Sequence, residues 1–173
     1  LQEQNYWSAA YHNHLHDFYD RNKTHVNLGY DTFKGLYGGL EGVDKVWTES
    51  DRQMIDATIG DYIDNQPFSV YYMTFSGHYA YDLEENPMCK KNAAEVAHLP
   101  YSDTVKAYIS CHLELEKAMA YLMEELEKAG KLEDTVIVMT SDHHPYGLSA
   151  KQYNELAGKT VDRNFDIYRN AFI

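Results

Sequence analysis

Two adjacent stretches of the sequence decide the fold class: Ser102–Gly130, SDTVKAYISCHLELEKAMAYLMEELEKAG, and Thr135–Thr140, TVIVMT. In the first stretch apolar residues recur at i, i+3 and i+4 while Glu and Lys occupy the opposite face, which predicts one long amphipathic helix. Ser102 is a typical N-cap residue, and Gly130 is typical of the position just past a helix end. The second stretch is apolar throughout and rich in β-branched residues, which is typical of a strand covered on both faces. A helix followed directly by such a strand indicates an α/β fold.

The same succession of helix and strand occurs earlier in the chain. A helix is expected from residue 50 or 51 to about residue 64, and the apolar run Pro67–Phe75 after it predicts a strand. Two shorter strands are expected at Trp7–Tyr11 and at His25–Leu28 or beyond. The alternation predicts a mostly parallel central sheet flanked by helices.

Length and composition limit the classes of protein to consider. The 173 residues, 44% of them hydrophobic, predict one packed core and a single domain. The net charge of -12 repels a phosphate backbone, so nucleic acid is not expected as a partner. Cys89 and Cys111 are too few for a disulfide scaffold and are expected as buried small hydrophobes, with a single disulfide between them as the alternative.

The two ends of the sequence suggest an excised piece of a longer chain. It opens at Leu1 without Met and stops after the apolar run Asn170–Ile173, which resembles a strand cut before its turn. It contains no apolar run of about 18 residues, the length that a membrane-spanning helix needs, and no secretory signal pattern. Any export signal or membrane anchor is therefore expected outside this segment.

Three polar clusters directly follow expected strands: Tyr11–Asp17 with its three His, Ser76–His78, and Ser141–His144. The carboxyl ends of parallel strands are where such sheets bind ligands. Asp142 and His143 leave one strand end together, and such a mixed oxygen and nitrogen pair suits Mn²⁺ or Zn²⁺ better than Ca²⁺. The clusters together indicate a site, although two ligands do not complete a metal centre.

Each cluster also has a purely structural interpretation. A Ser-Asp pair after a strand often caps the next helix, and Ser76-Gly77-His78 alone is typical of a turn. The three His of residues 12–16 alternate with a period of two, so a surface strand face rich in His is as good an explanation as a ligand set. Arg21, which follows Phe18 and Tyr19, suits a phosphate or sulfate held beside an aromatic wall, or else a surface salt bridge.

At these residues the sequence resembles the alkaline-phosphatase superfamily, and within it the sulfatase-like lipoteichoic acid synthases and related phosphoglycerol transferases. The matching pieces follow one order along nearly the whole chain: Ala10-Tyr11-His12-Asn13-His14, Phe18-Tyr19-Asp20-Arg21-Asn22, Gly29-Tyr30-Asp31, Asp51-Arg52-Gln53-Met54, Gln66-Pro67-Phe68, Thr74-Phe75-Ser76-Gly77-His78, Ser141-Asp142-His143-His144-Pro145-Tyr146-Gly147 and Tyr168-Arg169-Asn170. Each piece is weak alone, and the ordered series is strong. The resemblance implies that residues 1–173 are the central part of a single sulfatase-like catalytic domain, with an incomplete sheet.

The resemblance also implies roles for individual residues. It assigns Asp142 and His143 to a catalytic divalent metal, with Mn²⁺ expected first and Mg²⁺, Zn²⁺ or Ca²⁺ as alternatives. It assigns catalytic roles to His78 and His12. Substrate contacts fall to three residues around the headgroup: Arg21, Tyr19 and His14. Tyr19 stands where the synthases usually have Trp, and His14 stands where an acidic residue is often found, so the exact headgroup stays open.

The implied reaction is metal-dependent transfer or hydrolysis of a phosphodiester headgroup, with phosphoglycerol from a phosphatidylglycerol-type lipid expected first. In the family the Thr nucleophile and a further acidic ligand lie upstream of the His12 motif, so the isolated segment is expected to be inactive. The resemblance alone implies the outer face of a bacterial cell membrane. The alternatives are a sulfatase or phosphoethanolamine transferase of the same superfamily, and a noncatalytic binding module.

Overall fold

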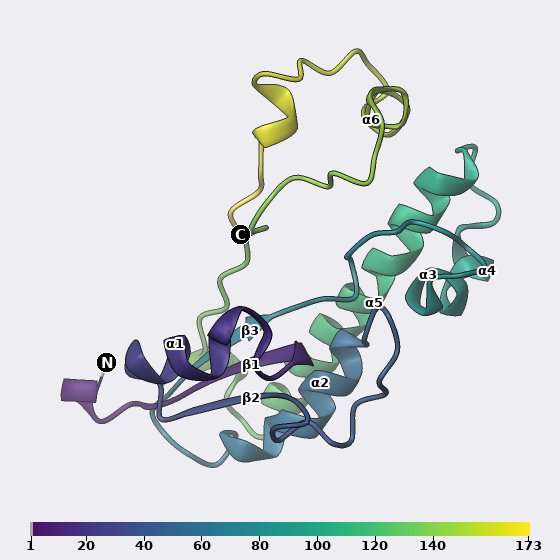
Figure 1. Cartoon of the computed structure of the whole chain (residues 1–173). Helices are drawn as coiled ribbons and strands as arrows, with labels where there is room; N and C mark the ends of the chain where they lie inside the picture. Colours follow the sequence, from purple (N-terminus) through teal and green to yellow (C-terminus); the bar gives the residue numbers. More distant parts are fainter. Residues whose placement is uncertain (1) are drawn as a thin grey trace.

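The computed structural model describes residues 2–173 and contains a small parallel sheet with helices on both faces (Figure 1). The strands are β1 (Trp7–Leu15), β2 (Thr32–Leu36) and β3 (Phe68–Met73), in the order β2-β1-β3. Both pairings are parallel, with Ala10 opposite Phe33 on one side and Tyr71 on the other. The expected α/β architecture with a parallel sheet is confirmed.

The helices differ greatly in length. They are listed in chain order: α1 (Arg21–Asn27), α2 (Asp51–Thr58), α3 (Pro87–Lys91), α4 (Ala93–Val96), α5 (Asp103–Lys128) and α6 (Ala150–Ala157). The predicted long helix is α5, which begins after Ser102, and the predicted second helix is α2, which continues as a 3-10 turn over Ile59–Asp61. The Ser102 side chain does not cap α5; it donates to Glu155 of α6 instead.

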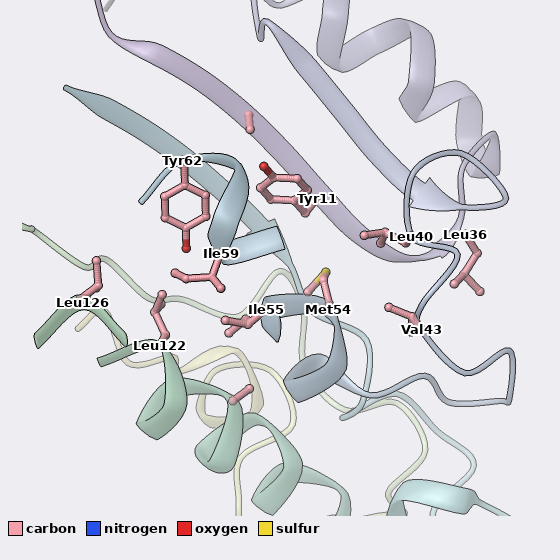
Figure 2. Packing of buried hydrophobic residues seen from close by; sticks show 12 residues of the cluster. Tyr11, Leu36, Leu40, Val43, Met54, Ile55, Ile59, Tyr62, Leu122 and Leu126 are labelled. Carbon is pink, nitrogen blue, oxygen red and sulfur yellow. The ribbon is translucent and has the colours of Figure 1, made fainter. Parts of the chain in front are cut away.

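The main core lies between the sheet and the pair of α2 and α5 (Figure 2). Tyr11 of β1 is fully buried there against Met54 and Ile55 of α2, and α5 closes the far side with Leu122 and Leu126. The opposite face of the sheet carries α1, where His25 stacks on Phe33 and Tyr71. Alternation along β1 therefore sends odd-numbered side chains toward α2 and even-numbered ones toward α1.

Two strand predictions are wrong. His25–Asn27 belongs to α1, which ends before Gly29 at φ 97, and the next strand begins only at Thr32. The run Thr135–Thr140 is extended but does not join the sheet: Val136 and Val138 are 87% and 59% exposed, and only Ile137 reaches the core. The backbone of this run pairs at Met139 with Ile173. Within residues 2–173 no strand of the sheet therefore lies beside Val136 and Val138 to cover their side chains, as a buried strand requires.

A second, smaller core joins the C-terminal part of the chain to α3 and the start of α5. Cys89 and Cys111 are both fully buried in it as free thiols, as expected, and Leu148 closes it from the segment before α6. The segment that follows the third polar cluster is thereby held against α5.

Candidate functional site

Most of the first polar cluster lies within β1 and not after it, because this strand runs on to Leu15 and only His16 and Asp17 follow it. Alternation therefore separates the cluster between the two faces of the sheet. His12 and His14 point to the side of α1, whereas Asn13 donates to Asp51 of α2 on the other side. His16 leaves the group and packs against Phe33. Of the three His residues predicted to act together, His12 and His14 therefore lie at the site and His16 lies outside it.

His12 is 2% exposed and both of its ring nitrogens are engaged. Nδ1 lies 2.9 Å from the carbonyl oxygen of Met73 at the end of β3, and Nε2 lies 2.9 Å from Nη1 of Arg21. Burial lowers the pKa of His12 to about 4, and the Arg21 charge contributes in the same direction. His12 is therefore a neutral imidazole at neutral pH.

Arg21 begins α1 directly after two residues in the left-handed conformation, Tyr19 at φ 54 and Asp20 at φ 55. This turn brings the guanidinium carbon to 5.4 Å from the Phe18 ring centre and 5.5 Å from that of Tyr19. Burial lowers the pKa of Arg21, while Tyr71 and Asp142 act in the opposite direction. The predicted Arg beside an aromatic wall is present, with Tyr19 77% exposed at its rim.

His14 is held by contacts that the sequence did not indicate. Its Nδ1 lies 3.1 Å from Oε1 of Glu49, and its ring stacks on Phe75 at a centre distance of 4.6 Å and meets Trp47 edge-on at 5.7 Å. Burial raises the pKa of Glu49. Trp47 and Glu49 lie in the loop before α2 and match no motif, so only their packing against His14 identifies them as part of the site.

His78 follows β3 and lies beside the same aromatic residues. Phe75 and Trp47 approach its ring at 4.8 and 5.2 Å between centres. Its Nδ1 lies 3.0 Å from the Tyr79 carbonyl oxygen; because a carbonyl only accepts, Nδ1 carries the proton and Nε2 keeps a lone pair. This ring meets that of His143 edge-on at 6.5 Å, so the second and third polar clusters adjoin in space.

Asp142 and His143 form an exposed pair of donors. His143 Nδ1 donates to the His144 carbonyl at 2.8 Å, so Nε2 is the nitrogen free for a cation, and it lies 3.6 Å from Oδ1 of Asp142. Tyr146 stacks on the His143 ring at 4.1 Å. Among residues 2–173 no group of three or more His, Cys, Asp and Glu side chains could hold a metal ion.

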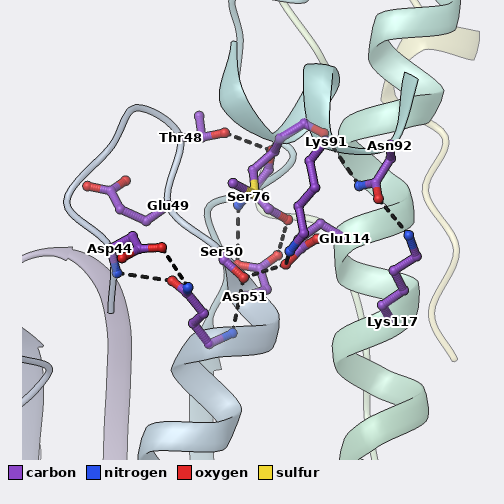
Figure 3. Close-up of polar contacts among 12 residues, drawn as sticks. Asp44, Thr48, Glu49, Ser50, Asp51, Ser76, Lys91, Asn92, Glu114 and Lys117 are labelled. Atoms are coloured by element: carbon purple, nitrogen blue, oxygen red, sulfur yellow. Dashed lines mark hydrogen bonds and ion pairs between the residues drawn. The ribbon is translucent and has the colours of Figure 1, made fainter. Parts of the chain in front are cut away.

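A buried carboxylate, Asp51, ties β1 to the segment after β3 beneath the site, and Figure 3 shows its contact with Ser76. Asp51, at the first turn of α2, accepts hydrogen bonds from the Asn13 amide of β1 at 2.8 Å and from the Phe75 backbone N–H at 2.7 Å. The Ser76 N–H and hydroxyl also donate to it. Asp51 therefore fixes the segment that leads to His78 relative to the strand that carries His12 and His14.

Two glycines allow close approaches that position the later clusters. A Cβ at Gly77 would lie 2.9 Å from Nε2 of His112 on α5, and a Cβ at Gly147 would lie 2.8 Å from both Tyr79 and Tyr81. Any side chain at either position would push the adjacent loop outward. The loops that carry His78 and His143 are thus packed against α5 and against each other.

The structure consequently brings the predicted residues into two neighbouring groups. One contains His12, Arg21 and Tyr19, and the other contains His78 with the Asp142–His143 pair. Phe75, Trp47 and His14 lie between them. In the described part of the chain no helix is long and apolar enough to cross a membrane.

Comparison with known proteins gives consistent results. The family model described as Sulfatase matches residues 1–173. Lipoteichoic acid synthase 1 of Bacillus subtilis (strain 168) is 24% identical over 98% of this chain, and the lipoteichoic acid synthase of Staphylococcus saprophyticus is 26% identical over 92%. The chain spans only 26% and 25% of the length of these relatives.

Two solved structures share the fold. The lipoteichoic acid synthase LtaP from Listeria monocytogenes superposes with a TM-score of 0.75 at 20% identity, over 99% of this chain and 43% of that one. The Streptococcus pyogenes phosphoglycerol transferase GacH, solved in complex with sn-glycerol-1-phosphate, gives a TM-score of 0.63 at 15% identity, over 96% of this chain and 42% of that one.

Proposed function

Because the chain belongs to the sulfatase family, we propose that it forms part of a divalent-metal-dependent site that transfers or hydrolyses a phosphodiester headgroup. The favoured substrate is a phosphatidylglycerol-type lipid that gives up phosphoglycerol. The names of the relatives, lipoteichoic acid synthase and phosphoglycerol transferase, support this choice. The observation that carries the proposal is that an Arg beside an aromatic wall, two His near the carboxyl ends of β1 and β3, and an exposed Asp-His pair lie close together.

Arg21 binds the phosphoryl group in this proposal. A guanidinium presents a planar fork of N–H groups that matches two phosphoryl oxygens, and its charge acts locally although the whole chain carries -12. One Nη1 proton is engaged by His12, and no other acceptor is recorded for the Arg21 side chain within the part of the chain that the structure describes. Tyr19 and Phe18 would flank the organic part of the headgroup.

Asp142 and His143 fit a divalent cation as two of its ligands. Their facing oxygen and nitrogen lone pairs, 3.6 Å apart, suit a positive ion, and exposure leaves room for further ligands. The donor types favour Mn²⁺, with Mg²⁺, Zn²⁺ and Ca²⁺ as alternatives. When bound, such an ion lowers the pKa of a coordinated hydroxyl and offsets charge on the phosphoryl oxygens.

His78 is the residue suited to moving a proton. Its Nε2 lone pair is free because Nδ1 donates to the Tyr79 carbonyl, so Nε2 can accept the proton of an incoming alcohol or water and return it to a leaving hydroxyl. Phe75 and Trp47 hold the ring in place. Arg21 offsets the negative charge that develops on the phosphoryl oxygens meanwhile.

We assign no nucleophile among these 173 residues. By resemblance it is a Thr upstream of His12, and residues 1–173 are the central part of one catalytic domain. We therefore expect transfer only in a protein that also carries the upstream part. A lipid-linked substrate, a membrane anchor elsewhere in the chain and a position on the extracellular face of a bacterial membrane belong to the same proposal.

The test compares His143→Ala with the matched control His98→Ala, because His98 is an exposed His away from the site. The protein, carrying its upstream region, is given vesicles of fluorescent phosphatidylglycerol with Mn²⁺, and the diacylglycerol formed is measured. Loss of product in His143→Ala and with a chelator, but not in His98→Ala, supports the proposal. Undiminished activity of His143→Ala contradicts it, and cleavage of an aryl sulfate in place of the lipid favours the sulfatase alternative.

Mn²⁺ binding to the 173-residue chain itself is measured by calorimetry, with Asp142→Ala as the control. Weak binding that this variant abolishes agrees with a two-ligand half-site. Binding that is unchanged in Asp142→Ala contradicts the assignment of the ligands.

A further inference from the structure

The two hydrogen bonds of His12 determine which ring nitrogen carries the proton. The Arg21 guanidinium has only donors, so His12 Nε2 must accept from Nη1 at 2.9 Å. The Met73 carbonyl only accepts, so His12 Nδ1 must donate at 2.9 Å. Neither partner can exchange its role, and the ring is locked as the Nδ1–H tautomer.

We propose that His12 is a positioning residue that aims Arg21 at an anionic phosphoryl group, and that it takes no part in proton transfer. The inference rests on the proposed function of Arg21 as the phosphoryl ligand. The imidazole is 2% exposed and its only lone pair is occupied by Arg21, so no nitrogen is left to exchange a proton with a substrate. Burial also holds its pKa well below neutrality.

The contrast with His78 supports this division of roles. Both rings donate Nδ1–H to a main-chain carbonyl, from Met73 in one case and Tyr79 in the other. Only in His12 does a guanidinium occupy Nε2. Of the two candidate catalytic His residues, His78 alone keeps a lone pair for a proton.

The geometry also explains how Arg21 keeps one orientation. Its guanidinium lies near the rings of Phe18 and Tyr19 at 5.4 and 5.5 Å, contacts that restrain it without directing its N–H groups. The bond to His12, which β1 and the end of β3 hold in place, directs Nη1 inward. The remaining N–H groups then form a fixed fork suited to two oxygens of a phosphate ester.

The tautomer is tested first, because this measurement does not depend on any ligand. Two-bond ¹H–¹⁵N correlation spectra of the 173-residue chain at pH 7, assigned with His12→Gln, should show His12 protonated at Nδ1 and bare at Nε2. An imidazolium, or a ring protonated at Nε2, overturns the inference.

Inorganic phosphate then serves as the probe for Arg21, with its Kd followed by ³¹P NMR. His12→Ala removes the acceptor and should weaken phosphate binding by roughly tenfold, the value of one charge-assisted hydrogen bond. His12→Gln supplies an amide oxygen in place of Nε2 and should restore binding to within about threefold of the wild type. Unchanged binding in His12→Ala, or equal loss in both variants, overturns the positioning role.

Catalysis supplies a readout that a merely structural role would not move. In the lipid assay His12→Ala should raise KM more than it lowers kcat, and His12→Gln should recover part of that loss in KM. The pH dependence of kcat should stay the same in both variants, because no proton passes through residue 12. A His12→Gln protein that is as inactive as His78→Ala contradicts the inference. If Arg21→Ala binds phosphate as well as wild type, the proposed function fails, whereas the tautomer result stands or falls separately.

Discussion

Replacing Asp51 by Ala should be among the most destabilising changes to the region beneath the site. The carboxylate is fully buried and accepts from four donors: the Asn13 amide, the Phe75 N–H, the Ser76 N–H and the Ser76 hydroxyl. Ala would leave all four donors buried without an acceptor. At about 1 kcal/mol for each lost bond, the free energy of unfolding should fall by roughly 4 kcal/mol. That is a large part of the ~5–15 kcal/mol typical of a domain.

Asp51→Asn is the informative second variant. Burial raises the pKa of Asp51, which means that the folded state pays a desolvation cost for the charge. A neutral amide avoids this cost, and its oxygen can still accept from Asn13 and Phe75, while the Ser76 hydroxyl turns from donor to acceptor. We expect a loss of only about 1–2 kcal/mol.

The assay is urea unfolding followed by circular dichroism, with Asp56→Ala as the matched control. Asp56 lies on the same helix with a 60% exposed side chain, so its removal should cost less than about 1 kcal/mol. The slope against urea should be equal in all variants, so that the midpoint reports stability alone. If Asp51→Ala unfolds at the midpoint of the wild type, the buried anchor described here does not exist in solution.

Three further outcomes are expected. The Cβ of Gly77→Ala would lie 2.9 Å from His112 Nε2, so this variant should lower the free energy of unfolding by about 1–2 kcal/mol. Adding His112→Ala should recover part of that loss, whereas additive losses in the double variant would refute the contact. The pKa of His12 is 6.5 in the unfolded chain and about 4 in the folded protein, so the unfolded chain takes up the proton first as the pH falls. The free energy of unfolding, measured from urea curves, should therefore decrease by about 3 kcal/mol between pH 6.5 and pH 4. This decrease should be absent in His12→Gln. Cys89 and Cys111 are buried, and their mutual hydrogen bond together with burial raises the pKa of Cys111. A disulfide reagent should therefore modify the two thiols only in urea. Fast modification of either thiol in the folded protein would contradict the second core.

Local patterns were sufficient for the long helix and the parallel sheet. In α5 the apolar spacing places Val105, Leu122 and Leu126 on one face over many turns, and any fold must bury that stripe. The same reasoning failed at Thr135–Thr140, because burial of an apolar strand depends on which strands lie beside it, and periodicity within six residues cannot state that. It failed at His25 because α1, with seven residues, is too short for a helical period to be visible.

The sequence by itself identified the candidate residues of the site: His12, Arg21, His78 and the Asp142–His143 pair. The sequence could not predict the separate roles of these residues, because the resemblance assigns the same catalytic role to His12 and His78. Only the tertiary structure decided that Arg21 covers Nε2 of His12 and leaves Nε2 of His78 open, and that a buried Asp51 joins the two strand ends. The physical reason is that a proton position depends on hydrogen-bond partners brought together by folding, and a linear motif does not record those partners.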